Sequence, residues 1–187
     1  MNMNTNTKTK TKATTAYPLV ICGVFAAVMV VCSWIAIPLP SGVPINLAVL
    51  GVLLSAGCLG FKYGTLTQLV YVLLGCVGLP VFAGFNGGLH VIAGPTGGYI
   101  VGYILCAGIV AFIASRTKSF WALVGAMILG VLACYAFGTL WYVHLMDITF
   151  AVGLAQCVIP FLPFDAIKIA LAALLVQRLR HTNLIKL

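Results

Sequence analysis

Acidic side chains are almost absent from this sequence: Asp147 and Asp165 are the only two in 187 residues. Ten Lys and Arg residues bring the charged fraction to only 6%, whereas 63% of the residues are hydrophobic. A soluble domain is typically about a quarter charged, so this composition excludes the soluble classes. The chain is predicted to be an all-α integral membrane protein. At roughly 20 apolar residues per crossing, its length accommodates about six transmembrane helices joined by short loops.

Pro, Gly and basic residues divide the chain into six predicted transmembrane helices. Residues 1–16 are polar and have nothing to bury, so we expect a disordered basic cytoplasmic tail. A single six-helix transmembrane domain is expected over residues 17–181, followed by a short cytoplasmic tail over 182–187. Residues 61–64 are expected to form a tight turn, and residues 149–159 a short helical segment before the last crossing. The predicted crossings cover residues 17–37, 45–60, 65–79, 99–114, 120–143 and 164–179.

The distribution of basic residues indicates the orientation in the membrane. Cytoplasmic loops are enriched in Lys and Arg. With both termini cytoplasmic, nine of the ten basic residues fall in cytoplasmic segments and none in an outer loop. The net charge of +8 is therefore explained by topology in a multi-pass plasma-membrane protein, and no nucleic-acid partner is expected. The nine are Lys8, Lys10, Lys12, Lys62, Arg116, Lys118, Arg178, Arg180 and Lys186.

The tenth basic residue, Lys168, follows Asp165 by three positions at the start of the last predicted helix. Residues at this spacing share a helix face. Ionisable groups inside a membrane segment are costly and mark ligand or ion paths by default, and a helix N-terminus favours an anion. The pair therefore predicts a site for a ligand with a carboxylate at one end and N–H groups at the other. The alternative is an ion pair that only fixes helix packing.

The outer loop between the third and fourth predicted helices, Pro80–Gly98, is rich in glycine yet mostly apolar. Long loops of this kind are often binding loops, and irregular backbone at membrane depth must be buried in protein or line a cavity. Asn86 offers a donor and an acceptor, and Phe82, Phe85 and Tyr99 offer apolar walls. A loop that only plugs the bundle is the alternative. We expect His90 to be a hydrogen-bonded loop residue rather than a ligand contact.

Other functional classes fit the sequence less well. Catalysis by paired carboxylates is excluded in practice, because Asp147 lies in a loop, and no G-x-S-x-G motif occurs. The seven cysteines lie in apolar runs without a C-x-x-C motif, so neither a metal site nor a cofactor is expected. No inverted repeat supports an autonomous transporter. A purely structural subunit would leave Asp165, Lys168 and the glycine-rich loop unexplained.

Two sequence stretches around this loop carry a family resemblance. Residues 78–88, GLPVFAGFNGG, and residues 94–99, GPTGGY, resemble the signature of the BioY family. This family comprises biotin-specific substrate-binding (S) subunits of energy-coupling factor (ECF) transporters. The resemblance continues through residues 135–141, YAFGTLW, and 160–168, PFLPFDAIK.

The resemblance implies that the chain captures biotin at the outer face of the membrane with high affinity for uptake. It places the site at Asn86, Asp165 and Lys168, with Gly87 in the loop motif and with Tyr99, Tyr135, Phe82 and Asn46 as further pocket residues. From charge alone, we assign the biotin carboxylate to Lys168 and the ureido group to Asp165 and Asn86. The family often reads VPFTLQ where residues 43–48 read VPINLA, so Ala48 replaces a glutamine.

Uptake against a gradient requires partners, because no P-loop motif occurs in the chain. The resemblance implies a transmembrane coupling protein (T component) and two cytoplasmic ATPases. Gly23 and Ala27 form a small-xxx-small pattern on the first predicted helix, which permits close helix approach. This pattern predicts docking to the coupling protein, and internal packing is an equally good explanation.

Overall fold

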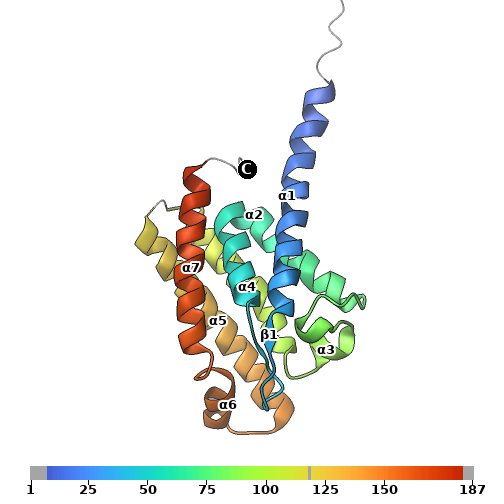
Figure 1. The fold of residues 1–187 in the computed structure, drawn as a ribbon, viewed down its shortest axis with the longest axis vertical. Coiled ribbons are helices and arrows are strands. Elements are labelled where there is room, and N and C mark those ends of the chain that lie inside the picture. Colours follow the sequence, from blue (N-terminus) through green and yellow to red (C-terminus); the bar gives the residue numbers. More distant parts are fainter. Residues whose placement is uncertain (1–7, 118, 183–187) are drawn as a thin grey trace, which may run out of the picture.

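The computed structural model describes residues 8–117 and 119–182, which form a bundle of helices with one small β-hairpin (Figure 1). The fold is mostly helical, as predicted. The elements are α1 (Lys8–Trp34), β1 (Ala36–Ile37), β2 (Ile45–Asn46), α2 (Ala48–Cys76), the 3-10 helix η1 (Ala83–Phe85), α3 (Leu89–Ala93), α4 (Gly97–Ala114), α5 (Phe120–Met146), α6 (Phe150–Cys157) and α7 (Leu162–His181).

Among the described residues, four helical segments are long and apolar enough to cross a membrane: residues 16–34 of α1, and the whole of α2, α4 and α5. Helices α6 and α7 make a fifth candidate as a pair bent by 54°. The break between the two helices spans residues 158–161 and includes Pro160. Pro163 sits in the first turn of α7, where a missing N–H costs nothing. The predicted short helix before the last crossing corresponds to α6.

Helix α2 is broken at Gly60, whose φ of 70° and ψ of −177° lie outside the helical region. Glycine adopts this conformation readily because it has no Cβ to clash with the backbone. Across the break, Gln68 Nε2 donates a hydrogen bond of 2.7 Å to Ser55 Oγ. In a straight helix these residues would be about 20 Å apart along the axis. The two arms of α2, residues 48–59 and 61–76, are therefore folded back against each other.

The predicted turn over residues 61–64 is displaced by this break. The chain turns at Gly60, and Gly64 is helical. A Cβ at Gly64 would lie 2.9 Å from the Cα of Ala56, so glycine is needed there for close approach of the two arms.

The ends of α1 differ from those predicted. The helix begins at Lys8, so residues 8–16 are helical where we expected a disordered tail. The predicted tails over residues 1–7 and 183–187 lie outside the described residues. Helix α1 ends at Trp34 rather than Ile37, because Ala36 and Ile37 pair in antiparallel register with Asn46 and Ile45.

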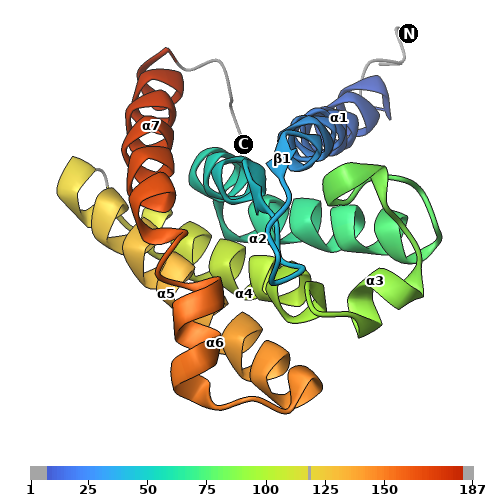
Figure 2. The same cartoon turned by 60° about the horizontal axis from the view of Figure 1, so that its bottom comes forward.

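The two ends of the bundle carry different structures. The first turns of α1 and the last turns of α7 lie at one end, the upper end in Figure 1, which we call the terminal end. The β-hairpin, α3 and α6 lie at the opposite end, which we call the loop end (Figures 1 and 2).

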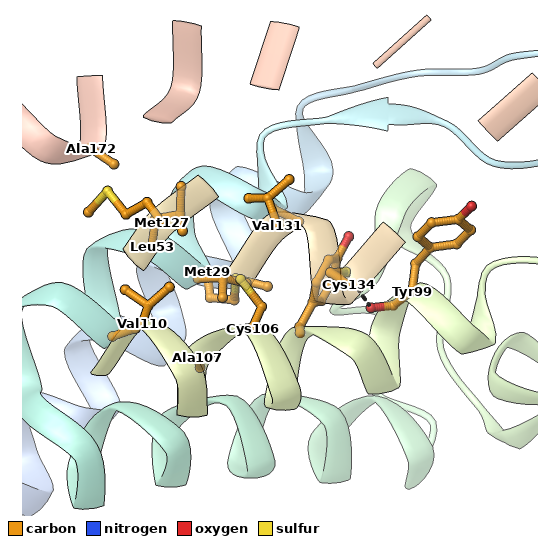
Figure 3. Packing of buried hydrophobic residues seen from close by; sticks show 14 of the residues in the cluster. Met29, Leu53, Tyr99, Cys106, Ala107, Val110, Met127, Val131, Cys134 and Ala172 are labelled. Carbon is orange, nitrogen blue, oxygen red and sulfur yellow. Dashed lines mark hydrogen bonds between the residues drawn. The ribbon is translucent and has the colours of Figure 1, made fainter. Parts of the chain in front are cut away.

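The core lies around α4, which packs mainly against α2 and α5. Small residues permit this close packing: a Cβ at Gly102 would lie 3.0 Å from the sulfur of Cys134, and one at Gly130 would lie 2.6 Å from Val110. Figure 3 shows the apolar side chains of this cluster, including fully buried Met29, Leu53 and Met127. Helix α1 is peripheral and packs against α2.

Candidate functional site

A cavity of about 380 Å³ lies at the loop end of the bundle. Small-molecule sites typically measure roughly 300–1,000 Å³. The hairpin of residues 36–46, the glycine-rich loop and helices α2, α4, α5 and α7 all contribute to its wall. Its lining is largely apolar, with polar side chains from Asn46, Asn86, Thr96, Asp165 and Lys168 and hydroxyl groups from Tyr71, Tyr99, Tyr103 and Tyr135.

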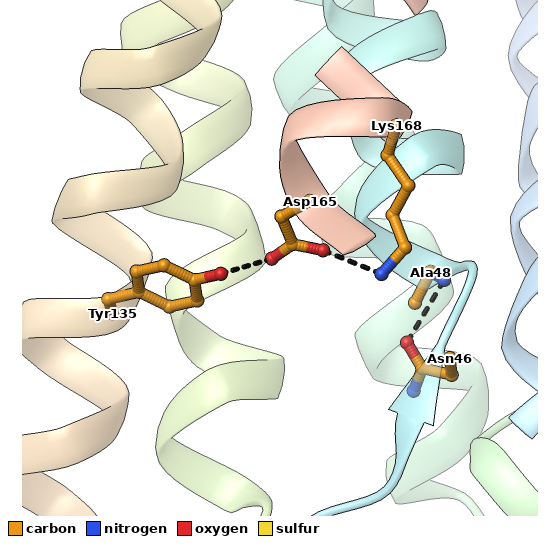
Figure 4. Close-up of polar contacts among 5 residues, drawn as sticks. All are labelled: Asn46, Ala48, Tyr135, Asp165 and Lys168. Atoms are coloured by element: carbon orange, nitrogen blue, oxygen red, sulfur yellow. Dashed lines mark hydrogen bonds and ion pairs between the residues drawn. The ribbon is translucent and has the colours of Figure 1, made fainter. Parts of the chain in front are cut away.

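Asp165 and Lys168 form an ion pair at this cavity, with Lys168 Nζ 2.6 Å from Asp165 Oδ1. The other carboxylate oxygen of Asp165 accepts a hydrogen bond from the hydroxyl of Tyr135 on α5 (Figure 4). Both charged residues are nearly inaccessible, with exposed fractions of 2% for Asp165 and 4% for Lys168. Burying two charges costs free energy that a paired geometry only partly repays, so a purely packing role explains this pair poorly.

The pair retains capacity for a ligand. An ammonium group has three N–H donors, and Asp165 engages one of those on Lys168. Each carboxylate oxygen has two lone pairs, and Asp165 accepts one hydrogen bond on each oxygen from the protein. The site therefore presents an acceptor and a donor side by side.

The aromatic walls are fixed by glycines and hydroxyl groups. Phe82, 2% exposed, packs against Gly75, where a Cβ would lie 1.9 Å from its ring. Tyr99 packs against Gly138, and its hydroxyl is 2.9 Å from Thr139 Oγ1. These contacts hold both rings at the cavity in fixed orientations.

The asparagines line the cavity from its two loops. Asn46 ends the hairpin, and its Oδ1 accepts a 3.0 Å hydrogen bond from the backbone N–H of Ala48 (Figure 4). Asn86 is exposed, and its Nδ2 donates to the carbonyl of Ala83 at 2.9 Å. The Ala48 side chain is fully buried and does not line the cavity.

The loops around the cavity are anchored to the helices. The N–H of Gly88 donates to the carbonyl of Gly75 at 2.7 Å, and Trp141 Nε1 donates to that of Gly94 at 3.0 Å. Tyr142 donates to the carbonyl of Ser41 in the hairpin at 3.0 Å. The glycine-rich loop is therefore an ordered part of the cavity wall.

The structure brings together seven of the eight residues predicted for the site: Asn46, Phe82, Asn86, Tyr99, Tyr135, Asp165 and Lys168 all line the cavity. Gly87 does not line it. A Cβ at this position would lie 2.1 Å from the carbonyl oxygen of Leu79, so Gly87 closes the base of the loop instead. His90 is exposed and is likewise not a lining residue.

Sequence reasoning missed several lining residues on α2 and α4. Tyr103 follows Tyr99 by one helical turn, and that spacing could have identified it. Tyr71 had no comparable signal, because only the break at Gly60 brings the second arm of α2 to the cavity beside the first. Cys106 and Cys134 also line the cavity, although both were expected only to fill apolar space.

The comparison with known proteins identifies the family. The family model described as "BioY family" matches residues 3–184. The chain belongs to the BioY family. A protein named biotin transporter BioY from Thermotoga maritima is 45% identical over 161 residues, covering 84% of this chain and 92% of that protein. One of the same name from Rhodobacter capsulatus is 35% identical over 168 residues, covering 83% and 88% of the two chains.

A solved structure agrees with this membership. The crystal structure of the S-component for biotin from an ECF-type ABC transporter matches this BioY-family chain with a TM-score of 0.82 and 28% identity, over 96% of this chain and 95% of the other. The relatives and the apolar helices together make the chain a multi-pass plasma-membrane protein.

In this BioY-family chain, the small-xxx-small pattern of α1 faces outward. Gly23 and Ala27 are both exposed, and a Cβ at Gly23 would meet no atom within 4 Å. Internal packing therefore does not explain the pattern.

Proposed function

We propose that the chain captures biotin in the cavity at the loop end, as the substrate-specific subunit of an ECF-type uptake system. One observation carries this proposal: a buried Asp–Lys pair lies at the wall of an otherwise largely apolar cavity in a chain whose relatives are named biotin transporters. Biotin combines an apolar ring with a ureido group, which has two N–H donors and one carbonyl acceptor. No catalytic role is assigned to any residue.

The geometry supports a revised orientation of the ligand. Assigning the carboxylate to Lys168 and the ureido group to Asp165 requires these residues to contact opposite ends of biotin. They are 2.6 Å apart, so that division does not fit. An adjacent acceptor and donor instead match the N–H and C=O of one ureido group, with the N–H bound by Asp165 and the carbonyl by Lys168. The carboxylate tail then extends away from the pair.

The remaining site residues complete this pocket. Phe82, Tyr99 and Tyr135 pack against the apolar ring system of biotin. The side-chain amides of Asn46 and Asn86 supply polar contacts from the two loops. Gly87 contributes indirectly by closing the loop that presents Asn86.

Six crossings are part of the same proposal. The fold-back at Gly60 turns α2 into two crossings, and α6 with α7 supplies one, which adds to α1, α4 and α5. Both termini are then cytoplasmic, and the loop end with its cavity opens to the outside. The basic residues, which concentrate toward the terminal end, support this orientation.

The partners are a T component and two cytoplasmic ATPases, which supply the energy for uptake. The ECF type of the matched S-component supports their involvement. The exposed Gly23–Ala27 face of α1 is the proposed docking surface for the T component, because small residues allow another helix to approach closely.

Equilibrium binding to the purified full-length chain tests the biotin site. Wild type is expected to bind biotin saturably. The double variant Asp165→Asn, Lys168→Met removes both charges at similar volume, a replacement that often preserves stability, and is expected to weaken binding by about 100-fold or more through lost charge-assisted hydrogen bonds. Asp147→Asn, at the exposed acid, is the matched control. Absence of saturable binding by wild type contradicts the proposed ligand.

Two ligand analogues test the orientation. Biotin amidated at its carboxylate should still bind to wild type, because the ureido group makes the contacts to the pair. 2-Iminobiotin, which replaces the ureido oxygen with a nitrogen, should bind much more weakly to wild type. Weaker binding of the amidated biotin than of 2-iminobiotin would instead support contact between the carboxylate and Lys168.

A further inference from the structure

The turn formed by residues 82–86 has two faces. The N–H of Phe82 donates to the carbonyl of Asn86 at 2.9 Å, which closes the turn. Phe82, Ala83, Gly84 and Asn86 line the cavity. Phe85, which we expected to be a further apolar wall, does not line the cavity, and 63% of its surface is exposed. A contact to Phe85 can therefore support the turn from outside the cavity.

Phe85 has a φ of 59°, in the left-handed region. A bulky residue with a Cβ is disfavoured there, because the Cβ approaches the following carbonyl oxygen. Such conformations persist only when surrounding contacts impose them. The turn therefore needs an external support on the Phe85 side.

Trp34, the last residue of α1, supplies that support. Its ring centroid lies 4.8 Å from that of Phe85, with the planes tilted by 30°. Its Nε1 donates a 2.7 Å hydrogen bond to the carbonyl of Pro80, at the start of the loop. Trp34 thus contacts the loop at two points but is not one of the residues that line the cavity.

A second connection from the same end of α1 runs in parallel. The hydroxyl of Tyr71 donates to the carbonyl of Val81 at 3.2 Å and lies 2.8 Å from Ser33 Oγ. Trp34 therefore contacts the start of the loop directly, and Ser33 does so through Tyr71. The chain just beyond α1 forms the hairpin on another side of the cavity. Trp34 lies at the junction of the two loops that border the site.

We propose that Trp34 is a positioning residue for ligand binding: it fixes the 82–86 turn in its strained conformation, so that Phe82 and Asn86 face the cavity. This inference rests on the proposed function for the identity of the ligand. The turn contacts a ligand bound in the cavity, and Trp34 holds the turn in position. Loss of Trp34 should therefore change the dissociation rate of the ligand more than its association rate.

The alternative is that Trp34 only anchors the helix at the membrane interface, where tryptophan is enriched. Its N–H is engaged by a backbone carbonyl of the loop, which argues for a specific role. Trp121 provides a matched control, because it is 78% exposed and its ring contact is with its neighbour Phe120. An interfacial role would give Trp34→Ala and Trp121→Ala the same effects.

Dissociation kinetics of labelled biotin from the full-length chain in lipid nanodiscs test the proposal. Trp34→Ala is expected to increase the dissociation rate by about 10-fold or more, with a much smaller change in the association rate. Trp34→Phe keeps a ring against Phe85 but lacks the N–H donor, so it should give an intermediate rate. Trp121→Ala should match wild type. Equal dissociation rates in Trp34→Ala and wild type would overturn the proposal.

Hydrogen exchange measured without ligand tests the positioning role of Trp34 independently of whether biotin is the ligand. The backbone N–H of Phe82 donates to Asn86 and that of Gly88 to Gly75 on α2. Both amides should exchange faster in Trp34→Ala than in wild type. Unchanged exchange would refute the positioning role whatever the ligand is. Faster exchange in a chain that does not bind biotin would support the positioning role and reject only the ligand.

Discussion

Arg180 Nη2 on α7 lies 2.7 Å from the carbonyl oxygen of Gly57 on the first arm of α2, across 123 positions of sequence. The same nitrogen donates to the carbonyl of Ala114 at the end of α4, at 2.9 Å. Carbonyls in the last turn of a helix lack intrahelical partners, and a cation there also complements the helix dipole. Arg180 therefore joins three helices at the terminal end, in addition to the topological role expected for a basic residue there.

Replacing Arg180 should destabilise the bundle, although Arg180 does not line the cavity. Arg180→Ala removes the charge-assisted hydrogen bonds to Gly57 and Ala114, and we expect a loss of about 2–3 kcal/mol. Thermal unfolding of the purified chain, monitored by size-exclusion chromatography, measures this loss of stability. Arg178→Ala, an exposed site on the same helix, should remain within about 0.5 kcal/mol of wild type. Equal losses in both variants would contradict the joining role of Arg180.

The residues of the candidate site were easier to predict from the sequence than the helix breaks and contacts that bring them together. Asp165 and Lys168 stood out because charges are rare in membrane segments, and their separation by three positions already placed them on one face. Their direct contact was not predictable, because it depends on Tyr135 from another helix holding the second carboxylate oxygen. The proposed orientation, with both residues at the ureido group of biotin, rests on this contact.

The fold-back of α2 shows a different limit. Residues 60–64 contain two glycines, and either could have marked the turn. The structure uses Gly60 for its backbone conformation and Gly64 for close packing, and only the tertiary contact with Ala56 distinguishes these roles. The start of α1 at Lys8 was missed because a polar segment gives no burial signal for a helix.

Gly75→Ala should disturb the cavity through Phe82. A Cβ at Gly75 would lie 1.9 Å from the Phe82 ring, so the ring and its loop must shift, at a cost of about 1–3 kcal/mol. We expect weaker biotin binding together with lower thermal stability. Gly125→Ala is the matched control on α5, because a Cβ there meets no atom within 4 Å. Biotin binding by Gly75→Ala at wild-type affinity would show that Phe82 does not shape the site.

Cysteine labelling tests the six-crossing arrangement. In a background without the native cysteines, Lys62→Cys should react with a membrane-impermeant maleimide only after the cytoplasmic side is exposed. Asp147→Cys, between α5 and α6, should react from the outside of intact cells. Labelling of both positions from the same side would exclude the proposed topology.

Enlarging the exposed small residues of α1 should separate capture from assembly. Gly23→Leu and Ala27→Leu project into open space, so biotin binding by the isolated chain should stay within about twofold of wild type. Co-purification with a T component and its ATPases should be lost, because the larger side chains prevent close helix approach. Val24→Ala, an exposed neighbour made smaller, serves as the control. If both leucine variants still assembled with the T component, the Gly23–Ala27 face would not be the docking surface.

The buried charges of Asp165 and Lys168 lie on α7, which follows α1, α2, α4 and α5 in the chain. Helix α7 qualifies as a membrane-spanning candidate only together with α6, whereas the earlier long helices qualify alone. During synthesis, the helices that enter the bilayer first can do so on their own hydrophobicity, and Asp165 and Lys168 arrive when the hydroxyl of Tyr135 is already in place to receive them. Chains truncated before α7 should therefore enter the bilayer but lack both charges at the cavity, so that ligand binding reports the insertion of α7.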